Sequence, residues 1–262
     1  METIVKQNPA APDGFFESEA AGLRWLAAAT DAGGARVAAV IAVASGRIEL
    51  ERIQPARPTP EAARAFGAAL ARTHDAGADA FGAPPAGWAG PGFIGDRPQA
   101  YAHDASWGAF YARDRVLPFL DIAEDAGSVT SGEARLVRQL CGFIADGEFD
   151  DGEPPARLHG DLWNGNLLWD ERGGVLIDPA AHGGHRETDL AMLALFGAPH
   201  LNELIAGYES VHPLHAGWRA RIPLHQLHPL AVHAASYGRG YGQELFAAAQ
   251  AVWHYRHSAE SH

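Results

Sequence analysis

Two carboxylates and one amide side chain are spaced along a short stretch of the chain in a pattern that can serve chemistry. Asp161 follows the pair His159-Gly160, Asn166 lies five residues beyond Asp161, and Asp178 lies twelve residues beyond Asn166. Transfer of a phosphoryl group from ATP depends on positioning and charge neutralisation more than on covalent catalysis. One carboxylate must orient the acceptor hydroxyl and take its proton, while a second carboxylate and an amide oxygen hold Mg²⁺ against the phosphates. A loop followed by a β-hairpin can bring these three side chains to one place.

The alternative interpretation is that these residues belong to ordinary turns. Asp, Asn and Gly are common in turns, and an isolated Asp-x-x-x-x-Asn pair arises often by chance. Protein kinases, however, use His-Arg-Asp-x-x-x-x-Asn followed by Asp-Phe-Gly. The same offsets occur here as His-Gly-Asp-Leu-Trp-Asn-Gly-Asn and Ile-Asp-Pro. The complete string, with Asp178 directly after the predicted strand residues Val175–Ile177, favours phosphoryl transfer.

Two charged residues near the N-terminus fit the same chemistry. Lys6 ends a short apolar segment, and Glu19 falls on the helix predicted next. In kinases a strand lysine contacts the phosphates and is held by a glutamate on a helix. Glu17 competes with Glu19 as the partner, and each of these charges alone is more often simply solvated.

Downstream of the loop, Asp189 lies eleven residues after Asp178, in a segment that begins a helix. Its carboxylate can cap that helix, or it can anchor the loop by accepting backbone N–H bonds. Both roles are structural, and we favour them over a direct part in the chemistry.

The elements around these residues predict a small α+β lobe, a hinge and a larger, mainly helical lobe. Pro55, Pro58 and Pro60 mark the hinge, and Thr59 is a suitable cap for the helix that follows. The predicted strands cover residues 2–6, 36–43, 166–169 and 175–177. The predicted helices cover residues 16–29, 61–74, 106–123 and 132–145 and most of the chain from 187 onward, and a loop fills 82–98. We therefore place the domains at residues 1–54 and 55–262.

Composition excludes several classes of function. The 262 residues carry a formal net charge of −12, which disfavours nucleic acid as a partner. No apolar run reaches the roughly 18 residues of a membrane span, and the start does not resemble a secretory signal. The single cysteine, Cys141, cannot form an internal disulfide, which fits a cytoplasmic protein.

The string Leu-His-Gly-Asp-Leu-Trp-Asn-Gly-Asn, followed by Ile-Asp-Pro-Ala, resembles the fructosamine (ketosamine-3-) kinase family. That family belongs to the aminoglycoside-phosphotransferase and protein-kinase-like superfamily. The resemblance runs from about Ile4 to Tyr241 and is strongest over residues 158–192. Further similar segments are Leu195-Phe196-Gly197, Tyr208–Leu214, Gly217-Trp218, Arg221, Gln226-Leu227 and Tyr237–Tyr241. The resemblance implies a bilobal protein-kinase-like fold, α+β, with a small N-terminal lobe.

The resemblance also implies a role for each matching residue. Asp161 would be the base, and Asn166 and Asp178 would bind Mg²⁺. Lys6 would contact the phosphates of ATP, held by Glu19. The remaining implied positions are the adenine hinge Glu51, Arg52 and Ile53, the acceptor-site residues Trp163 and His233, and the loop supports His159 and Asp189. For His233, an ordinary position on a helix face is an equally good interpretation.

The implied reaction transfers the γ-phosphoryl group of ATP to the 3-hydroxyl of a ketosamine, either a small molecule or a protein-linked one. The resulting 3-phosphate is unstable and eliminates, which releases the amine. The implied biological role is deglycation.

The N-terminus departs from the family. Its members begin with two strands and a glycine-rich turn over the phosphates, which need roughly 15 residues before the lysine. Here Lys6 follows only five residues. We therefore expect the N-terminal lobe to lack this hairpin, either because translation starts upstream of Met1 or because the lobe is short. A smaller departure is Ala181-His182-Gly183-Gly184, where the family has an aromatic residue.

Three other functions compete with this prediction. A related kinase would act on an aminoglycoside, choline or another hydroxyl compound. The missing hairpin would favour a catalytically impaired, non-catalytic homologue, whereas the presence of Asp161, Asn166 and Asp178 argues against it. A metal hydrolase is suggested by the 14 histidines, but no His-Glu-x-x-His motif is present, and His225 and His228 fit a solvated helix face.

Overall fold

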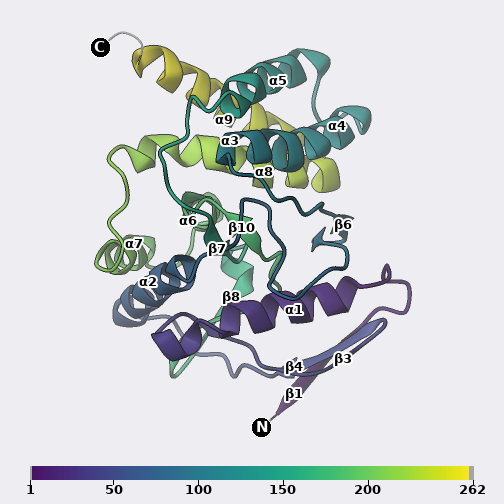
Figure 1. Ribbon diagram of the computed structural model, residues 1–262, viewed down its shortest axis with the longest axis vertical. Helices are drawn as coiled ribbons and strands as arrows, with labels where there is room; N and C mark the ends of the chain where they lie inside the picture. The colour runs from purple at the N-terminus through teal and green to yellow at the C-terminus, as the bar shows by residue number, and fades with distance from the viewer. Residues whose placement is uncertain (1, 260–262) are drawn as a thin grey trace. The chain divides into compact units, whose positions relative to one another are not determined.

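The computed structural model describes residues 2–259, and Met1, on which the question of an upstream start depends, lies outside this range. The chain divides into two units. The first unit comprises the residues up to His103 together with Pro154–Leu214, and the second comprises Asp104–Glu153 and the residues from His215 onward. Helices and small sheets occur together in the first unit (Figure 1), which confirms the α+β prediction. The predicted lobe boundary after residue 54 stays a prediction.

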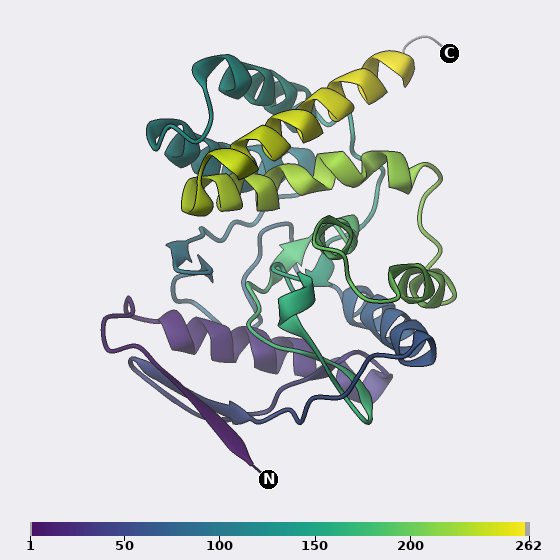
Figure 2. The same cartoon turned by 180° about the vertical axis from the view of Figure 1, so that it is seen from behind.

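A three-stranded antiparallel sheet in the first unit carries Lys6. Its order is β1-β4-β3, with β1 at Thr3–Gln7, β3 at Val40–Ala44 and β4 at Arg47–Glu51. Lys6 lies opposite Ile48, so the two side chains share one face of the sheet. Helix α1 (Phe15–Ala27) lies along the sheet (Figures 1 and 2).

The interface between α1 and the sheet is apolar. Phe16, Ala20 and Leu23 of α1 form one buried cluster with Ile48 and Leu50 of β4. These helix positions recur every three to four residues, as the helical period requires. The sequence therefore turns one face of α1 onto the sheet and holds the neighbouring Glu19 close to β1.

The strand predicted over residues 36–43 is wrong as a single strand. Its first part is β2 (Arg36–Val37), which pairs in parallel with β9 (Gly173–Leu176), whereas its second part is β3 in the other sheet. Between them the Ala38 N–H donates to Leu176 O and Ala39 O accepts from Glu51 N–H. An uninterrupted apolar run has no alternation that could have marked this crossing.

Short strands frame the segment from His159 to Asp178. Strand β7 (Ala156–Leu158) pairs with β10 (His182–Gly184) in the antiparallel direction. Strand β8 (Leu167–Asp170) forms an antiparallel hairpin with β9 and follows the 3-10 turn Asn164–Asn166. The hairpin that was predicted after Asn166 is therefore present, and its two ends lead to Asn166 and to Asp178.

Helix α2 (Pro60–Asp75) starts as the sequence predicts. The Thr59 hydroxyl accepts the Ala62 N–H at 3.2 Å, and Pro60 occupies the first helical position. Both features suit a helix N-terminus, because the first N–H groups have no partner within the helix. The end of α2 places His74 in the interior beneath the loop, whereas the next residue, Asp75, is exposed.

Helix α2 packs closely against α7 (Leu201–Glu209), and the two helices lie side by side in both views (Figures 1 and 2). Two glycines allow the contact. A Cβ on Gly67 would come within 1.8 Å of Leu204 O, and one on Gly207 within 1.9 Å of Arg64 O. Any larger residue at either position would have to separate the helices.

The remaining elements of the first unit are short or buried. They are the 3-10 turn Thr30–Ala32, β5 (Phe93–Ile94), β6 (Arg97–Pro98) and α6 (Glu187–Leu195). Strands β5 and β6 pair with each other inside the predicted loop 82–98. That loop is therefore interrupted by a small hairpin.

The second unit is helical. Its elements are α3 (Trp107–Phe110), the π-helical turn Tyr111–Val116, α4 (Leu117–Asp125), α5 (Ser131–Ala145), α8 (Trp218–Tyr237) and α9 (Arg239–Ala259). The helices predicted over 106–123 and 132–145 are present, although the first is wound as three consecutive pieces. No helix in the described range 2–259 is both long and apolar enough to cross a membrane.

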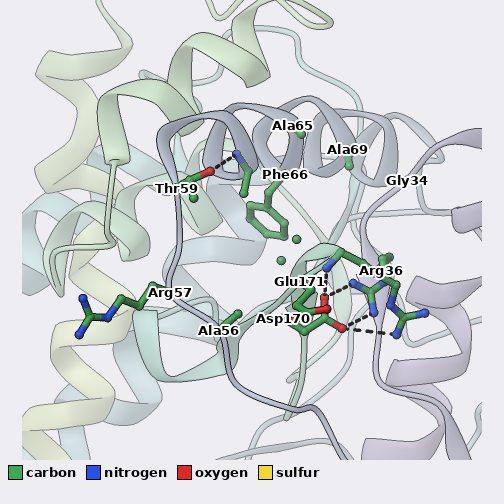
Figure 3. Close-up of a pocket in the computed structure, with 14 residues that line it drawn as sticks. Gly34, Arg36, Ala56, Arg57, Thr59, Ala65, Phe66, Ala69, Asp170 and Glu171 are labelled. Carbon is green, nitrogen blue, oxygen red and sulfur yellow. Dashed lines mark hydrogen bonds and ion pairs between the residues drawn. The ribbon is translucent and has the colours of Figure 1, made fainter.

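A hollow of about 510 Å³ lies beside the turn of the β8–β9 hairpin (Figure 3). At its edge, the Arg36 guanidinium donates to both carboxylate oxygens of Asp170, at 2.7 and 2.9 Å. These hydrogen bonds lower the pKa of Asp170 to about 2. Because Arg36 belongs to β2, this ion pair ties the tip of the hairpin to the neighbouring strand.

We predict that Asp170→Ala destabilises the first unit. The substitution leaves the Arg36 guanidinium without its main acceptor, and lost hydrogen bonds to a charged group cost about 2 kcal/mol. Glu203→Ala is the matched control, because it breaks the exposed Arg64–Glu203 pair, which should cost less than about 0.5 kcal/mol. Urea unfolding of both variants measures the difference. Equal losses would show that the Arg36–Asp170 pair does not hold the hairpin.

Candidate functional site

The loop after β7 is anchored by a buried carboxylate. Asp189 Oδ2 accepts the His159 N–H at 2.8 Å, and Oδ1 accepts the Gly160 N–H at 3.0 Å. Asp189 lies in the first turn of α6, whose N-cap is Arg186. Two structural roles were expected for Asp189: capping the helix or anchoring the loop. The geometry matches the second role, because the carboxylate accepts backbone N–H bonds from the loop.

Gly160 is required by the shape of this loop. Its φ is 82°, in the left-handed region that side chains disfavour. A Cβ at this position would also come within 2.2 Å of Ala180 O. The glycine lets the chain turn sharply between the anchored His159 and Asp161.

The His159 side chain connects the loop to the end of β9. Nε2 donates to Ile177 O at 2.8 Å, while Nδ1 accepts the Asp161 N–H at 3.2 Å. Burial lowers the pKa of His159, and a neutral ring provides the one donor and one acceptor that these bonds need. His159 thus fixes the backbone at Asp161 and just before Asp178.

Asn166 lies between the two candidate carboxylates. Its amide nitrogen donates to Asp161 O at 2.8 Å, to Asp161 Oδ2 at 3.0 Å and to Asp178 O at 3.4 Å. Desolvation by the surrounding protein raises the pKa of Asp161 to about 7, against the opposing effect of the Asn166 hydrogen bond. A carboxylate with that pKa can accept and release a proton near neutral pH.

A cation from β1 reaches the same place. Lys6 Nζ donates to Glu19 Oε1 at 2.7 Å and to Asp178 Oδ1 at 2.6 Å. Burial lowers the pKa of Lys6, but the two carboxylates outweigh it and the net shift is upward. Glu19, and not its rival Glu17, is therefore the partner of Lys6.

Asp178 has an unusual backbone. Its φ is 52°, which is uncommon for a residue other than glycine. Such strain is found most often where a side chain must be directed to a functional position. Here it accompanies a carboxylate that contacts Lys6 and remains partly exposed.

Asn166 and Asp178 offer oxygen atoms that fit Mg²⁺. The Asn166 contacts to Asp161 and Asp178 are all made by the amide nitrogen. Within the described residues, the amide oxygen accepts no hydrogen bond and can therefore serve as a ligand. Asp178 Oδ1 is bonded to Lys6 and its other oxygen has no partner in residues 2–259. Carboxylate and amide oxygens are the hard ligands that Mg²⁺ prefers, so this pair fits the ion.

The other predicted site residues are more dispersed. Trp163 is 41% exposed, and its ring packs edge-on against Phe196. Glu51 ends β4 and Arg52 donates its N–H to Glu2 O at 3.0 Å, while Ile53 makes no hydrogen bond within the described part of the chain. His233 lies in α8 of the second unit, where Nδ1 bonds Pro229 O at 2.7 Å, and its place beside the acceptor stays a prediction.

Sequence reasoning missed the residues beneath the loop. His74 and Tyr208 are fully buried and hydrogen-bonded to each other at 2.7 Å, and His74 also contacts Asp189. One signal could have identified His74. It continues the apolar positions Ala63, Phe66 and Leu70 of α2 at helical spacing, and a polar residue on such a face needs a buried partner.

Similarity to known proteins extends over nearly the whole chain. The family model described as fructosamine kinase matches residues 2–253. The chain belongs to the fructosamine kinase family. This confirms the resemblance stated from the loop sequence.

Individual relatives support the family assignment. Mouse ketosamine-3-kinase is 36% identical over 145 residues, covering 55% of this chain and 46% of the mouse protein. A crystal structure of a "putative fructosamine-3-kinase" from Thermobifida fusca is 47% identical, with a TM-score of 0.89 over 96% of this chain and 85% of that chain.

The fold is shared more widely. A thermostable aminoglycoside phosphotransferase variant matches with a TM-score of 0.61 at 16% identity, over 95% of this chain and 86% of that one. At that identity only the fold is comparable. The kinase-like fold class predicted from the sequence is confirmed.

The buried imidazoles predict acid sensitivity of this fructosamine kinase family member. Burial lowers the pKa of both His74 and His159, so below about pH 6.5 the unfolded chain takes up protons that the folded chain does not. Stability should be fully present above pH 6.5 and fall as the pH drops, with a limiting slope of about 1.4 kcal/mol per pH unit for each histidine.

His74→Gln tests this expectation, because glutamine does not titrate in this range. Urea unfolding at pH 7.5, 6.5 and 5.5 should give a shallower pH dependence for the variant than for the wild type. Identical slopes would show that His74 takes up its proton equally in both states.

Proposed function

We propose that the chain transfers the γ-phosphoryl group of ATP to the 3-hydroxyl of a ketosamine, with Asp161 as the base. Membership of the family supports the reaction. The observation that carries the residue assignment is the convergence of Asp161, Asn166, Asp178 and Lys6, which come from three separate segments of the chain. Kinases of this fold are expected to use ATP.

In this proposal Asp161 accepts the proton of the acceptor hydroxyl. As the hydroxyl oxygen bonds to the γ-phosphorus, the bond from that phosphorus to the bridging oxygen of ADP breaks, and ADP leaves with the electron pair. Asn166 orients Asp161, because its amide nitrogen holds one carboxylate oxygen and leaves the other for the substrate. The raised pKa of Asp161, about 7, suits this proton transfer.

The nucleotide would be held by β1 and by the segment after β4. Lys6 supplies a cation for the phosphates, and Glu19 fixes its position. Ile53 supplies a backbone N–H and C=O that no other described group uses, which are the groups a hinge presents to adenine. The Arg52 N–H is already bonded to Glu2 O, so we assign the donor to adenine to Ile53.

The site residues fit a divalent ion, which we propose to be Mg²⁺ held by Asn166 and Asp178. When bound, Mg²⁺ would neutralise the charge on the phosphates. Asp178, which Lys6 contacts in this structure, would be the carboxylate ligand of the ion.

We propose Trp163 as the residue that packs beside the acceptor. Its partly exposed ring lies over Gly165 of the same loop, and it is supported by Phe196. An aromatic face can cover the apolar side of a sugar ring. His233 stays a prediction, and so does a cytoplasmic location, which the single cysteine suits. The acceptor can be a small ketosamine or one linked to a protein.

Asp161→Asn tests the assignment of the base. The amide cannot take the hydroxyl proton, so kcat with a fructose- or ribose-derived amine, Mg²⁺ and ATP should fall by about 100-fold or more. The melting temperature should stay close to that of the wild type, because Asn keeps the shape of the side chain. ADP release measured in a coupled assay gives the turnover.

The matched control is Asp13→Asn, which makes the same change at an exposed position that is distant from Asp161 in the sequence. It should retain wild-type turnover. Wild-type turnover in Asp161→Asn would exclude Asp161 as the base, and equal turnover of kanamycin and the ketosamine would favour a kinase of broader substrate class.

A further inference from the structure

A chain of buried polar groups runs from the start of α6 through α7 and α2 and back to Asp189. Its members are Arg186, Tyr208, His74 and Asp189, each at most 3% exposed. Arg186 Nη1 lies 3.0 Å from the Tyr208 hydroxyl, which lies 2.7 Å from His74 Nδ1. His74 Nε2 lies 3.2 Å from Asp189 Oδ2.

The chemistry of these groups gives the chain one direction. A guanidinium only donates, so the Tyr208 oxygen accepts from Arg186. The single hydroxyl proton of Tyr208 is then available for His74 Nδ1, which leaves the proton of the neutral imidazole on Nε2. From there it is donated to the Asp189 carboxylate. Burial lowers the pKa of His74, which favours this neutral ring.

The Arg186 end of this row of polar groups is held by a carboxylate at the surface. Arg186 Nη1 also donates to Asp75 Oδ1 at 3.0 Å, and His212 Nδ1 lies 2.9 Å from the same oxygen. Asp75 and His74 are consecutive at the end of α2. One helix end therefore holds Arg186 through Asp75 and serves Asp189 through His74.

We propose that His74 and Tyr208 are positioning residues for phosphoryl transfer, which act through Asp189 on the loop that carries Asp161. Asp189 receives N–H bonds from His159 and Gly160 on one side and from His74 on the other. With the His74 donor in place, the carboxylate has one orientation that satisfies all three. Without it, the carboxylate can rotate, and the backbone before Asp161 loses its fixed acceptors. This proposal rests on the proposed function for its kinetic consequence only.

The test uses four variants of the full chain. Tyr208→Phe removes the hydroxyl that selects the His74 tautomer. Tyr111→Phe is its matched control, since the Tyr111 hydroxyl is equally buried, donates to Leu224 O and accepts the His228 N–H, all outside this chain of groups. His74→Leu removes the donor to Asp189, and His74→Gln keeps a donor at the end of the side chain.

We expect both Tyr→Phe variants to lose similar thermal stability, with only Tyr208→Phe losing turnover, by about threefold or more. His74→Leu should lower kcat about tenfold or more, as small displacements of a catalytic group do, with the KM for ATP changed much less. His74→Gln should recover most of the loss. Unchanged kcat in both His74→Leu and Tyr208→Phe, or equal kcat losses in Tyr208→Phe and Tyr111→Phe, would overturn the proposal.

Two measurements are independent of turnover. Amide hydrogen exchange should show lost protection at His159 and Gly160 in Tyr208→Phe but not in Tyr111→Phe. The ¹⁵N spectrum of the His74 ring should show the Nε2–H tautomer in the wild type and a shift in Tyr208→Phe. If the wild type does not phosphorylate ketosamines, the proposed function fails while these measurements still decide the network. Unaltered protection at the His159 and Gly160 amides in Tyr208→Phe would contradict the proposed network. If His74→Leu fails to fold, the comparison of Tyr208→Phe with Tyr111→Phe still decides between these outcomes.

Discussion

The site depends on one buried carboxylate that must have hydrogen-bond donors. Asp189 is 1% exposed, and an ionised group at that depth is stable only if donors surround it. Burial raises the pKa of Asp189, but the hydrogen bonds and charges of His74 and His159 outweigh the effect of burial. The net shift of the pKa is downward. Because two of those donors are backbone N–H groups of the loop, satisfying the carboxylate also fixes the path of the chain into Asp161.

A second ionic contact organises the other half of the site. Lys6 is shared between Glu19 and Asp178, so a cation from the N-terminal sheet meets a carboxylate at the end of β9. Asp178 holds its position at the cost of a left-handed backbone. In our proposal Lys6 and Mg²⁺ both bind the Asp178 carboxylate. Nucleotide binding is thereby coupled to the arrangement of the loop.

The sequence was most informative where spacing is dictated by chemistry. The offsets among Asp161, Asn166 and Asp178 predicted a common location, and the Thr59-Pro60 pair predicted a helix start, because each depends on a local pattern of residue types. Residue types alone left Glu17 and Glu19 as rival partners of Lys6, because both fall on the same helix; the family resemblance implied Glu19, and the structure shows that contact. The split of residues 36–43 between two sheets was not predictable from an apolar run without alternation.

Long-range polar pairing was also beyond the sequence. Arg36 with Asp170, and His74 with Tyr208, are joined across more than a hundred residues, and nothing local to any of these residues indicates its partner. Buried polar groups find partners through tertiary packing. The hinge was predicted as a segment, but only the structure shows that Arg52 uses its N–H within the protein and that Ile53 does not.

The central claim is that Asp161 faces the acceptor while Asn166 and Asp178 face the metal. A crystal structure with Mg²⁺, a non-hydrolysable ATP analogue and a ketosamine tests it directly. We predict Mg²⁺ at about 2.1 Å from the Asn166 amide oxygen and an Asp178 oxygen, with Asp161 within about 3 Å of the 3-hydroxyl. Asp161 bound to the metal, or a 3-hydroxyl directed away from Asp161, would contradict the account.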